Sequence, residues 1–217
     1  MVVPSGLALR AQTPAQPSSS SAKSKPGKKA ASDADSLLNA GIMGAGVYRN
    51  PAFGFTCKIP AGWVLRTADM NARDDEGAKP DGSQTTTDSG KAGRVLLAAF
   101  SRPPEARAED VNASILIAAE SATSYPGLKD AAQYFGPVTE VAKAQGFEID
   151  DDPYEFMVGT KTLARGDFQK DVGSRVMRQS TLVMLARGYV ISFTFIGGAE
   201  DEVEQLLQGL SFAAAAK

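Results

Sequence analysis

The aromatic residues of this 217-residue chain are confined to one part of it, which restricts where a hydrophobic core can form. Ten Phe, five Tyr and one Trp all lie between Tyr48 and Phe212. Because aromatic side chains bury the largest areas and dominate the energetics of a core, we expect a single folded domain over residues 48–212. The Ser-, Pro- and Lys-rich residues 1–47 are predicted to be a disordered tail, and residues 213–217 a disordered end.

The tail suggests where the protein acts. Residues 2–9 form a short apolar stretch that no positively charged region precedes, and the stretch resembles the remnant of a signal peptide. A Pro/Ser/Lys tether between such a remnant and a compact domain is common in exported bacterial proteins, so we expect a periplasmic or secreted bacterial protein. The lysines of residues 23–29 have no aromatic neighbours, and the rest of the chain is acidic, so nucleic-acid binding is not expected.

Alternating apolar residues predict strands at both ends of the domain. Phe53–Ile59 alternates apolar with polar side chains, Pro60–Gly62 turns the chain, and a second strand begins at Trp63. Arg94–Phe100 has the apolar run of a buried strand. Later in the chain the alternation returns, with Arg187–Gly188 as a hairpin turn. It predicts four further strands, over residues 154–160, 162–169, 174–186 and 189–196.

Helical periodicity occupies the middle and the end of the domain. Asp110 is a candidate cap for a helix whose apolar stripe covers residues 111–122. A second stripe covers residues 128–142, and a third covers residues 203–210 before a short closing strand at Phe212.

One long segment lacks the residues that build a core. Residues 68–93 contain no Val, Ile, Leu, Phe, Trp or Tyr, and we predict a long mobile loop there. The strands elsewhere are linked as hairpins, so they pair in antiparallel fashion, and the helices must cover the resulting sheet. The predicted fold class is therefore α+β, with an antiparallel β-sheet flanked by helices as an α-β-α sandwich.

Several short motifs resemble those of PsbP/Mog1/DcrB-type domains. Phe53–Phe55 followed by Ile59–Trp63 is similar to the "F-x-F-x-x-P-x-G-W" opening of these domains. Gly188–Phe195 resembles their late strand, Glu200–Val203 the acidic start of their last helix, and Leu210–Phe212 its "L-x-S-F" end. The resemblance implies the same sheet-and-helix fold and a binding role rather than catalysis.

Members of that family have different roles, so the resemblance does not fix a function. Plant PsbP assists the oxygen-evolving centre, Mog1 binds a Ran-type GTPase, and DcrB-like proteins lie in the bacterial envelope. Photosystem PsbP uses histidine in some of its contacts, whereas this chain has none, so the sequence does not favour a photosynthetic role.

The residue types that are missing restrict the chemistry. The chain has no histidine and one cysteine, which excludes histidine-based triads, intrachain disulfides and thiolate zinc clusters. Cys57 shares a strand face with apolar residues, so we expect it in the core. We predict no catalytic residue and no cofactor, and no apolar run approaches the roughly 20 residues of a membrane helix.

The resulting hypothesis is a non-catalytic, extracytoplasmic binding or accessory domain that contacts a protein partner. The sequence predicts neither the partner nor the oligomeric state. Two acidic groups are candidate sites. The candidate metal ligands are Glu148, Asp150 and Asp152, although the pattern of an EF-hand is absent and a solvated loop is the simpler interpretation. The candidate partner contacts are Asp74, Asp75 and Glu76, in the predicted loop.

An alternative hypothesis is a small-ligand-binding or carboxylate-based hydrolytic protein with a pocket between sheet and helices. In that case carboxylates together with Tyr125, Tyr134 or Tyr154 would have to act. A buried, closely spaced pair of carboxylates lining a cavity would favour this alternative.

Overall fold

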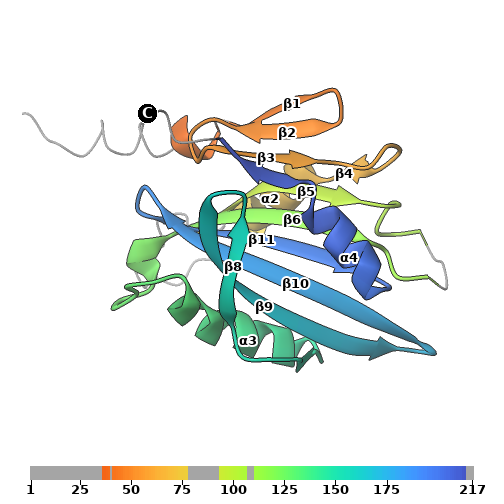
Figure 1. Ribbon diagram of the computed structural model, residues 1–217. Coiled ribbons are helices and arrows are strands. Elements are labelled where there is room, and N and C mark those ends of the chain that lie inside the picture. Colours follow the sequence, from red (N-terminus) through yellow and green to blue (C-terminus); the bar gives the residue numbers. More distant parts are fainter. Residues whose placement is uncertain (1–35, 40, 78–92, 107–109, 214–217) are drawn as a thin grey trace, which may run out of the picture.

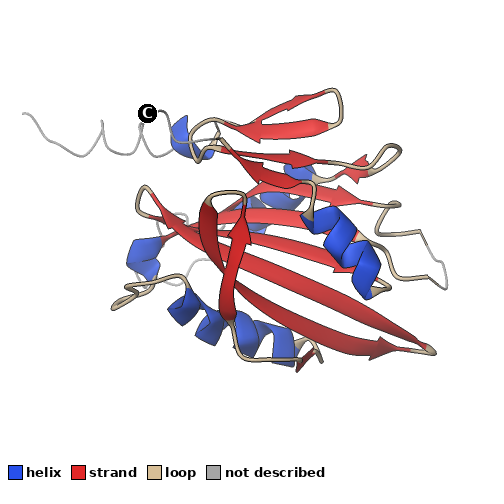
Figure 2. Ribbon diagram, viewed as in Figure 1, coloured by secondary structure: helices blue, strands red, loops and turns tan. Residues whose placement is uncertain are grey.

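The computed structural model describes residues 36–39, 41–77, 93–106 and 110–213. Two antiparallel β-sheets pack against each other (Figures 1 and 2). The large sheet has seven strands in one path, and β8 (Tyr154–Val158) pairs with β9 off this path. From edge to edge the path is β4 (Val64–Leu65), β5 (Gly93–Phe100), β6 (Ser114–Ser121), β11 (Tyr189–Gly197), β10 (Arg175–Ala186), β9 (Lys161–Val172) and β7 (Glu148–Ile149).

The small sheet joins the two ends of the described chain. Its order is β1 (Ile42–Gly44), β2 (Val47–Asn50), β3 (Phe55–Lys58) and β12 (Leu210–Phe212). The last strand, β12, pairs with β3 in antiparallel register, with Leu210 opposite Cys57. Residues from both ends of the domain therefore complete one sheet, as the orange and dark blue strands of Figure 1 show.

Helices cover both faces of the large sheet. Helix α3 (Phe135–Ala144), preceded by the 3-10 turns η1 (Ala122–Ser124) and η2 (Ala132–Tyr134), packs on one face. Helix α4 (Glu200–Leu207) packs on the other face beside the small sheet (Figure 1). Helix α2 (Thr67–Gly77) lies along β5.

Apolar side chains form one core on each face of the large sheet. On the face toward the small sheet, the Phe193 ring meets the Phe55 ring edge-to-face at 4.9 Å and the Phe212 ring at 6.0 Å. On the face toward α3, Phe135 packs over β9, where a side chain at Gly166 would lie 2.5 Å from the Phe135 ring. Gly166 therefore lets the helix approach the sheet closely.

The predicted fold class is confirmed, with antiparallel sheets and flanking helices. The four late strands were predicted almost as they occur. Strands β9, β10 and β11 alternate between the two cores, whereas β8 contacts one core through Phe156 and Val158. The prediction had one sheet, whereas the structure has two. Strand β3 pairs with β2 and β12 in the small sheet, and β4 pairs with β5 in the large sheet. The early strands at Phe55 and Val64 thus belong to different sheets.

The predicted helix over residues 111–122 is wrong. This segment contains β6, which pairs with β5 on one side and β11 on the other. The β-branched Ile115 and Ile117 are fully buried in the core on the side of the small sheet, as expected for a central strand. The predicted second helix starts later than expected, at Phe135, after two 3-10 turns.

The predicted loop over residues 68–93 is wrong in its first part, where α2 forms; residues 78–92 lie outside the described residues. Polar groups fix α2 to the sheet in place of an apolar stripe. The Asn71 side chain donates to the Val95 carbonyl and accepts from the Val95 amide, and the Thr67 hydroxyl accepts from the Ala98 amide. These bonds satisfy backbone groups along the edge of β5.

Ordered structure also begins before residue 48, contrary to the predicted tail. Residues 36–38 are helical, Leu38 packs against the core, and β1 and the start of β2 form a hairpin. The remaining tail residues, 1–35, and the last four residues, 214–217, lie outside the described residues.

Candidate functional site

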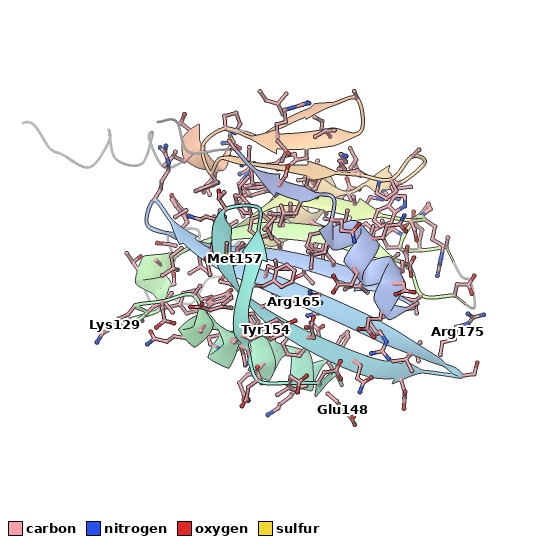
Figure 3. The ribbon with its side chains drawn as sticks, viewed as in Figure 1. Lys129, Glu148, Tyr154, Met157, Arg165 and Arg175 are labelled. Carbon is pink, nitrogen blue, oxygen red and sulfur yellow. The ribbon has the colours of Figure 1, made fainter. Side chains whose placement is uncertain are left out.

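A polar cleft lies between the large sheet and α4, and we call it the Arg165 cleft. It encloses about 330 Å³. Figure 3 labels Arg165 and Tyr154 on this face of the sheet. Strands β9 and β10, helix α4 and the connection between β7 and β8 supply its walls. The lining residues are Asp150, Asp151, Tyr154, Arg165, Asp167, Phe168, Arg178, Gln179, Glu200, Val203 and Glu204.

Arg165 is the charged residue at the base of the cleft. It occupies a core-facing position of β9, opposite Leu182, and its side chain is only 9% exposed. Its Nε donates to both carboxylate oxygens of Asp167, at 3.0 Å each, and its Nη2 donates to Glu204 of α4. Burial acts to lower the pKa of Arg165, but its bonds to Glu204 and Asp167 raise it overall. The guanidinium is therefore a fixed charge.

Two aromatic rings from β8 lie beside this guanidinium. The Arg165 Cζ atom is 4.8 Å from the centroid of the Phe156 ring and 5.9 Å from that of Tyr154. The Tyr154 hydroxyl donates to Asp167 at 2.9 Å. Burial, followed by this hydrogen bond, raises the pKa of Tyr154 to about 12. Tyr154 is therefore a hydrogen-bond donor at neutral pH.

The side of the cleft that Asp150, Asp151 and Glu200 line has more negative than positive charge. Asp150 lies 3.9 Å from Arg178, while Asp151 and Glu200 have no ion-pair partner among the described residues. Desolvation raises the pKa of Asp150; Arg178 acts against this rise, and the nearby carboxylates add to it.

A second cluster of tyrosines lies on the other face of the sheet. Tyr125 and Tyr134 both donate to the carboxylate of Glu120, and their rings meet at right angles with centroids 5.0 Å apart. Burial is the main cause that raises the pKa of both hydroxyls. They border a shallow cavity of about 380 Å³ whose lining also includes Pro126 and Pro137. All three tyrosines named in the alternative hypothesis thus donate to carboxylates.

The residues predicted as metal ligands do not gather around one point. Among the described residues no group of three His, Cys, Asp or Glu side chains is arranged to hold a metal ion. Asp150 lines the cleft, whereas Glu148 (labelled in Figure 3) and Asp152 are exposed outside it. The predicted partner contacts, Asp74–Glu76, lie at the end of α2, where the structure does not describe side chains.

The sequence interpretation missed the role of Arg165. From the sequence it is one of several cations in the late strands, and its charge alone does not distinguish it from solvated charges. The available signal was its position, because it takes the inward place that Leu163 occupies two residues earlier. A charged residue at an inward strand position requires ionic or hydrogen-bonding partners. Its partner Glu204 lies 39 residues further along the chain, so no local spacing could reveal it.

Cys57 lies in the core as predicted, and we expect it to resist alkylation in the folded protein. It is 0% exposed, and burial raises the pKa of its thiol to about 12. A maleimide added at pH 8 is expected to leave the folded chain unlabelled and to label one site after urea unfolding, as read by intact mass. Rapid labelling without urea would contradict the buried position.

The raised pKa of Cys57 also affects stability at high pH. The thiol ionises more readily in the unfolded chain than in the folded chain, so its contribution to the free energy of unfolding falls as pH rises from about 9 to about 12.

Comparison with known proteins gives matches in structure but not in sequence. No family model matches the chain, and no curated protein matches it. Also, none of the described helices is long and apolar enough to cross a membrane. The similar solved structures include PsbP (CyanoP) of the cyanobacterium Synechocystis, at 17% identity and a TM-score of 0.43, covering 79% of this chain and 95% of that chain.

Two further solved structures match at similarly low sequence identity. The Ran-binding protein Mog1p of Saccharomyces cerevisiae has 14% identity and a TM-score of 0.41, with 72% of this chain and 86% of that chain covered. LpqN of Mycobacterium tuberculosis, described as involved in cell envelope biogenesis, has 15% identity and a TM-score of 0.35, with 74% and 83% covered. Structures of PsbP and Mog1p, the proteins that the sequence motifs resemble, are thus among the solved structures that match this chain.

Proposed function

We propose that this chain is a non-catalytic binding or accessory domain that contacts a protein partner, and that the Arg165 cleft is its binding surface. The observation that supports this most is the fixed geometry of the cleft. Arg165 is held by Asp167 and Glu204 and packed on Phe156, so the wall does not have to rearrange when a ligand enters. Preorganised side chains of this kind reduce the entropy cost of binding.

The protonation states in the cleft favour binding over catalysis. Asp167 accepts from Arg165 and Tyr154, and Glu204 accepts from Arg165, so these carboxylates already have hydrogen-bond partners. The pKa of about 12 keeps the Tyr154 hydroxyl protonated at neutral pH. A general base needs a pKa near the working pH and access to a substrate proton.

A second candidate function is the binding or hydrolysis of a small ligand in the same cleft. It is favoured by the volume, since about 330 Å³ falls within the range of small-molecule sites. It is also favoured by Asp150, whose pKa is raised by burial. Hydrolysis would make Asp150 the acid or base, so Asp150→Asn would abolish turnover of any substrate found.

A site-specific cross-linking experiment tests the main proposal. Cys57 is buried, so a maleimide photo-cross-linker attached to the full-length D151C variant reacts at the cleft. The matched control is E140C, which replaces an exposed acidic residue of α3, the helix on the other face of the sheet. We expect one stoichiometric product from the envelope fraction of the source cells with D151C and none with E140C. The partner is then identified by mass spectrometry and the complex reconstituted from purified proteins.

Two results would oppose the proposal. The same products from both variants would mean that partners are cross-linked non-specifically. No product from D151C would mean that the cleft is not the surface that contacts the partner. The extracytoplasmic location that we also propose rests on the sequence of residues 1–35 alone. Fractionation of the source cells tests it, and recovery of the protein in the cytoplasm would contradict it.

A further inference from the structure

We propose that the Arg165 cleft recognises a positively charged ammonium or guanidinium group, supplied by a Lys or Arg side chain of the partner protein. This inference rests on the proposed function and adds the chemistry of the ligand. Three features carry it: the charge balance of the walls, an unpaired hydroxyl beneath them, and an exposed aromatic ring at the mouth.

The charge balance of the cleft is negative. Its lining residues include two cations, Arg165 and Arg178, and five anions, Asp150, Asp151, Asp167, Glu200 and Glu204. Arg165 is paired with Asp167 and Glu204, and Arg178 lies near Asp150. Asp151 and Glu200 have no cation within ion-pair distance among the described residues, so both are free to pair with a charge from outside. A cleft with a net negative lining raises the local concentration of cations.

An unpaired hydroxyl lies beneath this charged wall. Ser180 is directly opposite Asp167 in the β9–β10 register, so both side chains point to the same side of the sheet. Ser180 is 1% exposed, and its Oγ has no hydrogen-bond partner among the described residues. A buried hydroxyl without a partner is costly. Ser180 does not itself line the cleft, so an N–H donor that enters beside Asp167 would provide the missing partner only by displacing the side chains that cover Ser180.

The mouth of the cleft suits a long basic side chain. Tyr154 is 41% exposed, and its ring already lies near the Arg165 guanidinium. An aromatic face at the entrance can pack against the aliphatic stem of Lys or Arg and attract its charged end. A bare metal ion fits the walls less well, because no group of three ligating side chains is gathered among the described residues.

Isothermal titration calorimetry with the full chain tests the inference. The probes are acetyl-trilysine amide and acetyl-triarginine amide, with acetyl-triglutamate amide as the anionic control and putrescine and agmatine as free cations. The test variant is D151N/E200Q. The matched control is D152N/D201N, which removes two neighbouring acidic residues that do not line the cleft, so the net charge of the two variants is equal.

We expect saturable binding of a basic peptide that weakens with added salt. D151N/E200Q should lower the affinity about tenfold, as expected for two partly exposed ion pairs, whereas D152N/D201N should change it by less than about twofold. Ser180→Ala should lower the affinity about fivefold, through loss of one hydrogen bond. The acidic peptide should not bind.

Several results would overturn the inference. These are failure of both basic peptides to bind at low ionic strength, equal losses in the two double variants, or preference for the acidic peptide. Tighter binding of putrescine or agmatine than of the peptides would assign the site to a free cation in place of a partner side chain. If D151C cross-links a partner while the basic peptides fail to bind, the cleft binds a partner of other chemistry. The proposed function would then survive this inference.

Discussion

Truncation of Phe193 to alanine is expected to lower the free energy of unfolding by about 3–5 kcal/mol. Phe193 is 0% exposed on the central strand β11, and its ring contacts Phe55 of the small sheet edge-to-face. Its loss removes buried aromatic surface and leaves a cavity between the two sheets, which surrounding side chains cannot fill without strain. Urea denaturation of the full chain, followed by circular dichroism, measures the change.

A neighbouring residue provides the control for this prediction. Ser192 is next in the same strand, is half-buried and points to the opposite face, so Ser192→Ala should change the free energy of unfolding by less than about 1 kcal/mol. A loss below about 1.5 kcal/mol for Phe193→Ala would show that the two sheets do not share the core described above.

The double substitution Asp167→Asn and Glu204→Gln is expected to lower the free energy of unfolding by about 3–5 kcal/mol. It retains the shape of both side chains but removes the two negative charges that compensate Arg165. Because the Arg165 side chain is only 9% exposed, the guanidinium would remain buried without a counter-charge. Urea denaturation at pH 7 measures the effect.

A triple variant separates charge from packing in this prediction. In R165M/D167N/E204Q the unpaired guanidinium is replaced by an apolar side chain of similar length, so most of the lost stability should return. If the triple variant is no more stable than the double variant, the loss comes from local packing. A loss of less than about 1 kcal/mol in the double variant would mean that water reaches Arg165.

The sequence predicted the elements whose side chains alternate between two apolar layers. In β11, every second residue from Tyr189 to Phe195 faces the small sheet, and in β10 Leu182 and Met184 do the same. This period of two is dictated by the strand itself and does not depend on distant residues. The late strands, the closing helix and the α+β class could therefore be predicted.

The elements that were mispredicted depend on distant partners. The alanines of β6 permit a helix as readily as a strand, and pairing with β5 and β11 decides between them. Helix α2 has no apolar stripe, and the bonds of Thr67 and Asn71 to the backbone of β5 hold it in place. Apolar periodicity carries no information about such contacts.

The candidate cleft itself could not be predicted from the sequence. Asp150, named as a candidate metal ligand, lines the cleft, but its proximity to Arg165 and α4 was not predicted. The cleft combines side chains from β9, β10, α4 and the β7–β8 connection, which only the folded sheet brings together. Sequence spacing describes neighbours along one element, whereas this site is formed across several elements.

The closure of the small sheet by β12 has a consequence for the synthesis of the protein. Thr56 and Ser211, which share a hydrogen bond across β3 and β12, are 155 residues apart. A ribosome adds about 5–20 residues per second, so about 8–30 s separate the synthesis of the two strands. During this interval β3 has an unpaired edge, and Phe55 has no Phe212 to pack against. Nascent chains of this protein therefore expose a strand that chaperones can recognise until the last residues of the domain have been made.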